Sequence, residues 1–315
     1  MSINVCNDRS MASITSLPSG VSSGSLVLIS TTTASSSSTV NITSGIDSTY
    51  KEYIIKAINV HPSANAQLEI HFSVDGGSNF NTNMTTSVFQ SDTKGLINIL
   101  QTLSEKDYQK LMKISPKLAA LNKDRHLGFA KTSKKDSMQA IFAFYGDVYT
   151  SLRVEDFTEK DLLFAQDNLR ILSGLYGILR PFDLIKPHRL EMGTALKNTR
   201  GDNLYQWWGP KIADSLNKEI ESHRSKIFIN LASEEYYKSI KGQLLETVVT
   251  PIFQERKGSE FKVIGINAKR ARGLMARFII KNKILKVDKL KHFSSAGYKF
   301  NEKLSSQNTL IFQRN

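Results

Sequence analysis

Cysteine is almost absent from this chain of 315 residues, because Cys6 is the single one. One cysteine excludes an internal disulfide framework and any zinc site built mainly of thiolates. The sequence also lacks a run of about 18 apolar residues, and its N-terminus lacks the charged and then apolar order of a secretory signal. These absences predict a protein of a reducing compartment without a membrane partner, and the cytoplasm is the expected location.

Features of the common cofactor and metal sites are also missing. The six histidines are scattered, without the paired spacing of a zinc-binding helix. No glycine-rich phosphate loop, dinucleotide fingerprint or serine nucleophile elbow is present. The sequence therefore predicts no cofactor, no intrinsic metal site and no catalytic residues, although a site assembled from distant residues such as His188 and Glu191 stays open.

Positive charge is abundant and unevenly distributed, with a net charge of +13. Residues 1–95 hold four basic and six acidic side chains, whereas the other 220 residues hold 38 basic and 23 acidic ones, a net charge of +15. Such an excess favours polyanions as partners through counterion release. A solubilising surface is an equally good explanation of the same charge.

The residue patterns divide the chain into three parts. Residues 1–45 are predicted to be a Ser/Thr-rich leader or linker, because such a composition buries little surface. Residues 46–95 predict a small antiparallel β unit, since apolar and polar residues alternate over 68–74 before a turn at Asp75-Gly76-Gly77. Residues 97–315 alternate helical and strand patterns, which predicts an α/β domain of the mixed α+β kind.

Capping and periodicity predict several elements of this α/β domain. Thr158 and Asp161 have the spacing of a capping box, and an apolar helical face then repeats over 162–176. Residues 226–231 predict a strand, followed by a short helix that Ser233 would cap.

Strands are also predicted toward the C-terminus. Residues 247–254 contain Pro251, which suits an edge strand or an irregular position because proline cannot donate a hydrogen bond to a ladder. Residues 262–267 are predicted to be a further strand. Residues 297–300 and 309–312 predict a closing hairpin.

A helix after Asn267 has the clearest basic pattern. At about 100° per residue, its apolar side chains share one arc and its cations the opposite arc. Such cations can follow a phosphate backbone, although a solvated helix face gives the same pattern. The apolar residues are Ala268, Ala271, Leu274, Met275, Phe278 and Ile279, and the cations are Lys269, Arg270, Arg272, Arg277 and Lys281.

A second candidate site is the glycine-containing segment 172–181. Gly174 and Gly177 stand at the expected end of the preceding helix, where free amides of a tight turn can hold a phosphate. Plain capping of the helix, followed by a proline, explains the same residues. The cations expected to face the phosphate are Arg180, Lys186 and Arg189, in one groove with the cations of the basic helix.

A third cluster lies where a predicted strand ends and a helix begins, the place where open α/β sheets bind ligands. Polar groups there could contact a small anionic or nucleotide-like substrate, in which case the protein would be an enzyme. Helix capping and first-turn acids explain the same residues. The candidates are Asn230, Ser233 and Glu234, with Arg189 and Glu191 from an earlier segment.

Six segments stand in a fixed order along the basic part: 146–149 (GDVY), 172–181 (LSGLYGILRP), 189–193 (RLEMG), 204–209 (LYQWWG), 230–236 (NLASEEY) and 268–275 (AKRARGLM). Together they resemble the YaaA family of peroxide stress proteins. The resemblance covers residues 97–315, without the opening segment usual in the family. It implies a cytoplasmic protein of the hydrogen peroxide response, which limits damage from unincorporated iron and binds DNA through a positive cleft and a helix-hairpin-helix element. By position, that hairpin would be 172–181.

The N-terminal part has a different resemblance. Residues 43–53 and 75–79 resemble short β-rich structural proteins of marine tailed phages, which implies an assembly role or none. The leading hypothesis is a noncatalytic stress protein that binds the DNA backbone with little sequence preference. The alternatives are an enzyme that uses the same cleft and a phage-associated structural fusion.

Overall fold

The computed structural model describes residues 84–130 and 136–315. The chain divides into two compact units, Met1–Thr82 and Asn83–Asn315, and the described residues belong to the second. The predicted leader (1–45) and most of the predicted β unit (46–95) lie outside the described residues. A helix already begins at Gln90, so the helical part starts earlier than residue 97.

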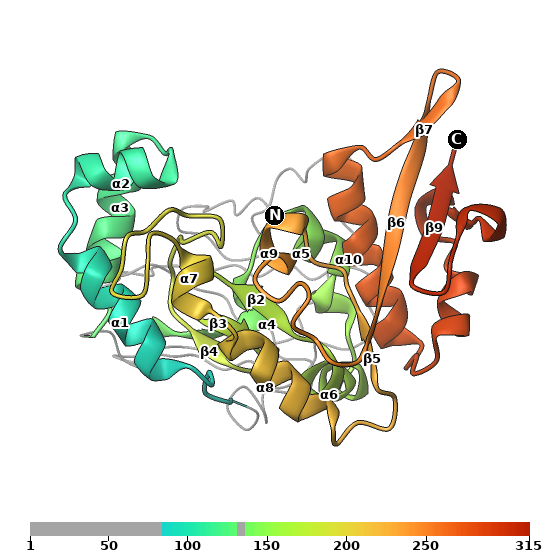
Figure 1. Cartoon of the computed structure of the whole chain (residues 1–315), viewed down its shortest axis with the longest axis horizontal. Coiled ribbons are helices and arrows are strands. Elements are labelled where there is room, and N and C mark those ends of the chain that lie inside the picture. Colours follow the sequence, from blue (N-terminus) through green and yellow to red (C-terminus); the bar gives the residue numbers. More distant parts are fainter. Residues whose placement is uncertain (1–83, 131–135) are drawn as a thin grey trace, which may run out of the picture. The chain divides into compact units, whose positions relative to one another are not determined.

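Helices and strands alternate through the described unit, which confirms the mixed α/β class (Figure 1). The helices are α1 Gln90–Gln101, α2 Glu105–Met112, α3 Pro116–Leu127, α4 Ala140–Ala143, α5 Asp147–Leu152, α6 Glu159–Asn168, α7 Leu204–Trp208, α8 Lys211–Ile220, α9 Glu234–Tyr237 and α10 Gly265–Lys281. The strands are β1 Met138–Gln139, β2 Ile171–Ser173, β3 Gly177–Leu179, β4 Leu184–Ile185, β5 Ile227–Ile229, β6 Thr247–Lys257, β7 Glu260–Lys262, β8 Lys299–Phe300 and β9 Thr309–Arg314. None of the helices within the described ranges is both long and apolar enough to cross a membrane.

The main sheet has the strand order β5-β6-β9-β8, and β7 also pairs with β6. Strands β5, β6 and β9 are parallel, and β8 is antiparallel to β9, which confirms the predicted closing hairpin. Helix α10 packs against β6 beside this sheet (Figure 1). Two smaller antiparallel pairs, β1-β4 and β2-β3, stand apart from the main sheet.

Pro251 lies in a strand with neighbours on both sides, so the edge-strand alternative was wrong. Strand β6 has β5 on one side and β9 on the other. The N–H of Thr250 donates to the carbonyl of Asn308 beside β9 at 2.9 Å, and successive N–H groups alternate between the two sides of a strand. The nitrogen of Pro251 therefore faces the β5 side, where the pairing ends at Val249. No ladder hydrogen bond is lost there.

Helix α10 is buried on two sides. Ala271 and Met275 belong to the core beside the main sheet, as the apolar arc predicted, whereas Ala276 and Ile280 pack into a second core with residues around α5 and α6. Gly273 permits this second contact, because a Cβ there would lie 2.1 Å from the carbonyl oxygen of Val148 in α5. The helix also begins at Gly265, so the strand predicted over 262–267 was wrong beyond the end of β7.

Helix α6 begins as predicted and ends earlier than predicted. The hydroxyl of Thr158 accepts from the N–H of Asp161, and the carboxylate of Asp161 accepts from the N–H of Thr158, which confirms the capping box. The helix stops at Asn168 because Arg170 turns back, and its guanidinium donates to the carbonyls of Gln166 and Leu169 at 2.8 and 2.6 Å. These bonds satisfy carbonyls that a continuing helix would have used.

The close approach of α5 and α10 predicts that Gly273→Ala destabilises the fold. The added methyl group would force the two backbones apart, at a cost of roughly 1–3 kcal/mol. Gly265→Ala is the matched control, since a Cβ at the first residue of the same helix meets nothing within 4 Å. The free energy of unfolding in urea measures both variants, and equal stability of Gly273→Ala and the parent chain would contradict the packing described here.

The buried carboxylate of Asp161 predicts a pH-dependent contribution to stability. Burial alone would raise its pKa, but hydrogen bonds from Lys281, Lys283 and Thr158 outweigh burial and hold the pKa well below its usual value. Because an unfolded aspartate titrates near about 3.9, the stabilisation is complete above that pH and is lost as the pH falls below it. Asp161→Asn should therefore lower the free energy of unfolding by about 1–3 kcal/mol at pH 7. The difference between the two proteins should stay constant down to about pH 4 and narrow below it.

The control for this titration is Asp288→Asn, which breaks the exposed surface pair between Asp288 and Lys291. This substitution is expected to change stability little at any pH, because water and salt screen an exposed pair. A difference between Asp161→Asn and the parent chain that stays constant well below about pH 4 would contradict the role assigned to this carboxylate.

Candidate nucleic-acid interface

The basic side of α10 faces carboxylates of the α5–α6 region rather than an open groove. The ion pairs are Arg270 with Asp147 (3.0 Å), Arg277 with Asp156 (3.1 Å) and Lys281 with Asp161 (2.8 Å). Arg277 also donates to the carbonyls of Leu152 and Arg153. The predicted groove of free cations on this helix was therefore wrong for these three residues, since the second buried side of α10 brings acidic neighbours onto them.

Two cations of α10 have no carboxylate partner among the described residues. Lys269 is exposed and forms no ion pair there. Arg272 is half-buried, and its Nε donates to the carbonyl of Ala268 at 3.2 Å. Burial lowers the pKa of this guanidinium, with no counter-charge to offset it. Lys269 is therefore the one predicted cation of α10 that is both exposed and without an ion pair to a described carboxylate.

The segment 172–181 is a β-hairpin and not the end of a helix. Strands β2 and β3 pair in antiparallel register, and Gly174 and Gly177 flank the turn between them. Gly174 packs against the carbonyl of Leu190, and its own carbonyl accepts from the indole N–H of Trp208 at 3.0 Å. Gly177 has φ of +72°, which only glycine adopts readily. The hairpin is buried, so its glycines offer no exposed amides to a phosphate, and a helix-hairpin-helix at this position was a wrong prediction.

The three cations expected beside this turn are also engaged. Arg180 pairs with Asp183 at 3.0 Å, the Nζ of Lys186 donates to the carbonyl of Phe129 at 2.5 Å, and Arg189 pairs with Glu191 at 2.8 Å. Asp183 is fully buried, and Arg180 also bonds its second oxygen through the backbone N–H at 2.8 Å. Arg180 therefore stabilises the fold around the turn, whereas the exposed pair of Arg189 and Glu191 stays accessible to solvent.

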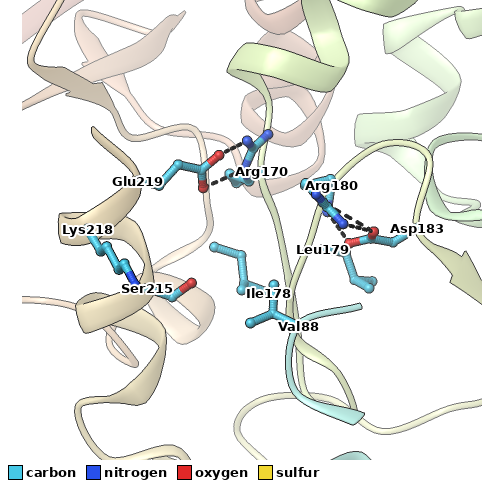
Figure 2. Close-up of a pocket in the computed structure, with 9 residues that line it drawn as sticks. All are labelled: Val88, Arg170, Ile178, Leu179, Arg180, Asp183, Ser215, Lys218 and Glu219. Carbon is cyan, nitrogen blue, oxygen red and sulfur yellow. Dashed lines mark hydrogen bonds and ion pairs between the residues drawn. The ribbon is translucent and has the colours of Figure 1, made fainter. Parts of the chain in front are cut away.

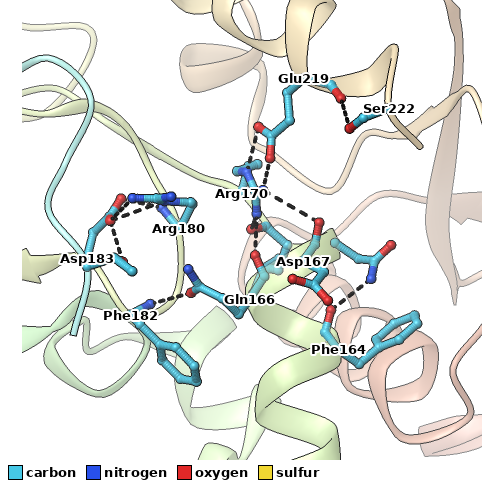
Figure 3. Close-up of polar contacts among 12 residues, drawn as sticks. Phe164, Gln166, Asp167, Arg170, Arg180, Phe182, Asp183, Glu219 and Ser222 are labelled. Atoms are coloured by element: carbon cyan, nitrogen blue, oxygen red, sulfur yellow. Dashed lines mark hydrogen bonds and ion pairs between the residues drawn. The ribbon is translucent and has the colours of Figure 1, made fainter. Parts of the chain in front are cut away.

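One pocket of about 320 Å³ lies between the β2-β3 hairpin and α8 (Figure 2). Its two arginines are paired with acids, Arg170 with Glu219 and Arg180 with Asp183. Arg170 also bonds the carbonyls that end α6, so it joins α6 to α8 (Figure 3). Burial lowers its pKa to about 10, which leaves the side chain charged at neutral pH. These contacts give the pocket wall a structural role.

Two of the residues predicted for a small-ligand site, Asn230 and Glu234, form local contacts. The amide oxygen of Asn230 accepts from the N–H of Ala232 at 3.1 Å, and Glu234 pairs with Lys241 at 2.7 Å. Ser233 precedes α9 at the N-cap position, without a side-chain hydrogen bond to the helix. The pocket in Figure 2 includes none of these residues, nor Glu191. In the described ranges no group of three or more His, Cys, Asp or Glu residues is placed to hold a metal ion.

A two-helix hairpin that the sequence analysis missed is formed by α2 and α3. Three residues join the helices, and Lys113 occupies the left-handed region with φ of 52°. The hydroxyl of Ser115 caps α3 by accepting from the N–H of Leu118, and Pro116 follows at the first helical position. The N–H of Lys117 has no acceptor among the described residues. The turn therefore exposes the positive end of a 12-residue helix.

Cations are numerous along this hairpin, and Lys110, Lys113 and Lys117 are those nearest the turn in sequence. The hairpin, residues 104–128, contains six basic and three acidic residues. None of the six forms an ion pair with a described carboxylate, in contrast to the cations of α10. The basic residues are Lys106, Lys110, Lys113, Lys117, Lys123 and Arg125.

The base of the hairpin is held by buried polar contacts. The hydroxyl of Tyr108 in α2 lies 2.7 Å from Nδ1 of His126 in α3 and also donates to the carbonyl of Leu100 in α1. Burial lowers the pKa of His126 to about 4, so its ring is neutral at physiological pH. Gln101 donates to the carbonyl of His126 at 2.8 Å. The turn is thus presented from an anchored pair of helices.

Comparison with known proteins places this fold in a family. The family model described as "Peroxide stress protein YaaA" matches residues 61–304, so its match begins inside the predicted β unit. A UPF0246 protein of Aliivibrio fischeri strain MJ11 is 49% identical over 242 residues, which are 75% of this chain and 93% of that protein. UPF0246 proteins of Saccharophagus degradans strain 2-40 and Colwellia psychrerythraea strain 34H are 48% and 49% identical, over 73% and 67% of this chain and 91% and 83% of their own lengths. The chain belongs to the YaaA family of peroxide stress proteins.

Proposed function

We propose that this protein acts in the peroxide stress response by binding the phosphate backbone of DNA through the α2–α3 hairpin. The observation that carries the proposal is the contrast between two basic regions. The cations of α10 are largely paired with carboxylates, whereas those of the hairpin form no ion pair with a described carboxylate. Charge that is already neutralised releases few counterions from DNA, so the hairpin is the favoured contact.

The hairpin turn suits a phosphate group in geometry as well as in charge. Anions bind at helix N-termini because free N–H groups and the helix dipole both favour negative charge there. At the start of α3 the N–H of Lys117 has no acceptor within residues 84–130 and 136–315, and the exposed side chains of Lys113 and Lys117 flank it. Such contacts read the backbone and carry no base information, so binding is expected to show little sequence preference.

Backbone binding offers a physical route to protection from iron-driven oxidation. Hydrated iron(II) is attracted to the same phosphates, and hydroxyl radicals formed beside the backbone react where they arise. A protein that neutralises phosphates displaces such cations from its footprint. Protection is therefore proposed to require bound protein and no metal site in the protein.

The proposal predicts that Lys113→Gly combined with Lys117→Gln weakens duplex DNA binding. Two lost phosphate contacts should reduce the affinity at low salt by about tenfold or more and reduce the slope of log K against log salt by about 2. Lys113→Gly also relieves a left-handed φ of 52°, so the fold should not be weakened there. Fluorescence anisotropy of the full chain with labelled duplex at several salt concentrations measures both quantities.

A matched control removes the same charge elsewhere. Lys299 and Lys303, near β8, form no ion pair with a described carboxylate, and the Lys299→Gln, Lys303→Gln variant should bind nearly as the parent chain does. Equal weakening by both double variants would show a response to net charge alone. Absence of duplex binding at low salt, or a salt slope unchanged by the hairpin variant, would overturn the proposal.

A further inference from the structure

Tyr145 is an exposed aromatic residue whose position packing does not explain. Its side chain is 92% exposed, although tyrosines usually cover much of their ring surface. Its neighbour Phe144 turns inward. The ring of Phe144 stacks on Tyr149 with the centroids 5.2 Å apart, and it meets His188 edge-on with the centroids 6.1 Å apart. Burial of one side chain and exposure of the next follow from the extended backbone of Phe144.

The loop that carries Tyr145 is fixed on both sides. The packed ring of Phe144 precedes it, and Gly146 follows with φ of +135°, a conformation that strongly favours glycine. Helix α5 then starts at Asp147, whose carboxylate pairs with Arg270. An exposed ring on a constrained loop loses little conformational entropy when a flat partner stacks on it.

Cations lie on α10, the helix that packs against α5. Arg270 pairs with Asp147, two residues after Tyr145, and its side chain is still 56% exposed. Lys269 precedes Arg270 on the exposed side of α10 and forms no ion pair with a described carboxylate. Helices α5 and α10 pack closely, which keeps these cations and the tyrosine on neighbouring elements (Figure 1).

We propose that Tyr145 is a stacking platform for unpaired nucleobases, with the exposed Lys269 attracting the adjacent phosphates. An exposed aromatic ring beside basic side chains is the combination by which proteins bind single-stranded nucleic acid without sequence preference. This inference rests on the proposed nucleic-acid binding and extends it, because it selects DNA with unpaired bases. Such bases occur at gaps, frayed ends and oxidatively damaged sites.

The stacking site connects with the hairpin through a series of ring contacts. Phe129, just beyond the end of α3, has its ring centroid 6.5 Å from that of Tyr176. The ring centroids of Tyr176 and His188 are 5.1 Å apart, and His188 in turn meets Phe144. The hairpin turn and Tyr145 therefore belong to the same compact unit, so a duplex at the turn and a single-stranded tail at Tyr145 can be bound by one protein molecule. To reach Tyr145 from the hairpin turn, the single-stranded tail must be at least as long as α3, whose 12 residues measure about 18 Å.

The test compares three DNAs of equal charge with the full chain: a duplex, an unstructured oligothymidine and a duplex with a single-stranded tail. Tyr145→Ala should weaken the affinity for the oligothymidine by about 5- to 100-fold. The variant should also bind the tailed duplex no more tightly than the plain duplex, and its affinity for the plain duplex should stay unchanged. Tyr145→Phe keeps the ring and should bind as the parent chain does. The salt slope should not change in either variant, because no charge is lost.

Leu245→Ala is the matched control, since Leu245 is 84% exposed and lies outside this surface. Unchanged oligothymidine binding by Tyr145→Ala, or equal weakening of all three DNAs, would overturn the stacking site while the hairpin contact to duplex remained. Failure of the parent chain to bind duplex DNA would instead overturn the proposed function. The two failures are therefore distinguishable.

Discussion

The close crossing of α5 and α10 is the constraint on which the charge distribution of this protein depends. Gly273 lets the two backbones approach, and this approach gives α10 a second buried side. It also brings acidic residues of the α5–α6 region within ion-pair distance of cations that helical periodicity alone would leave in solvent. The same contact involves Asp161, whose carboxylate is nearly buried. Ion pairs with Lys281 and Lys283 compensate the cost of burying its charge.

Pairing of α10 changes which surface can attract a polyanion. A net charge of +13 suggests a broadly basic protein, yet a cation already bound to a carboxylate adds little to counterion release. The α2–α3 hairpin has the complementary properties: few acids, no ion pair to a described carboxylate, and a helix N-terminus at its tip. Lys113 has a φ that favours glycine, so the turn accepts some local strain there and gains a cation. Membership of a peroxide stress family gives this surface a physiological context without fixing its ligand.

Local patterns in the sequence predicted local structure well, and contacts between distant segments poorly. The capping box at Thr158, the strand β5 and the β8-β9 hairpin were correct, because each depends on residues near one another in the chain. The helix predicted to continue to Tyr176 was wrong. Apolar spacing cannot distinguish its last part from a buried hairpin, and the stop at Arg170 involves Glu219 in α8. The partners of the α10 cations lie more than 100 residues away and could not be deduced. The missed hairpin did leave a signal, in two serine caps separated by one short helix.

The most direct measurement is a lysine-reactivity footprint of the full chain with and without duplex DNA, read by mass spectrometry after acetylation. Bound phosphate should protect Lys110, Lys113 and Lys117 from acetylation, because these side chains are exposed to solvent in the free protein. Lys281 and Lys283 should react equally slowly in both states, since Asp161 already holds them. Protection confined to lysines of α10, with the hairpin lysines equally reactive in both states, would contradict the assignment of the open charge to the hairpin.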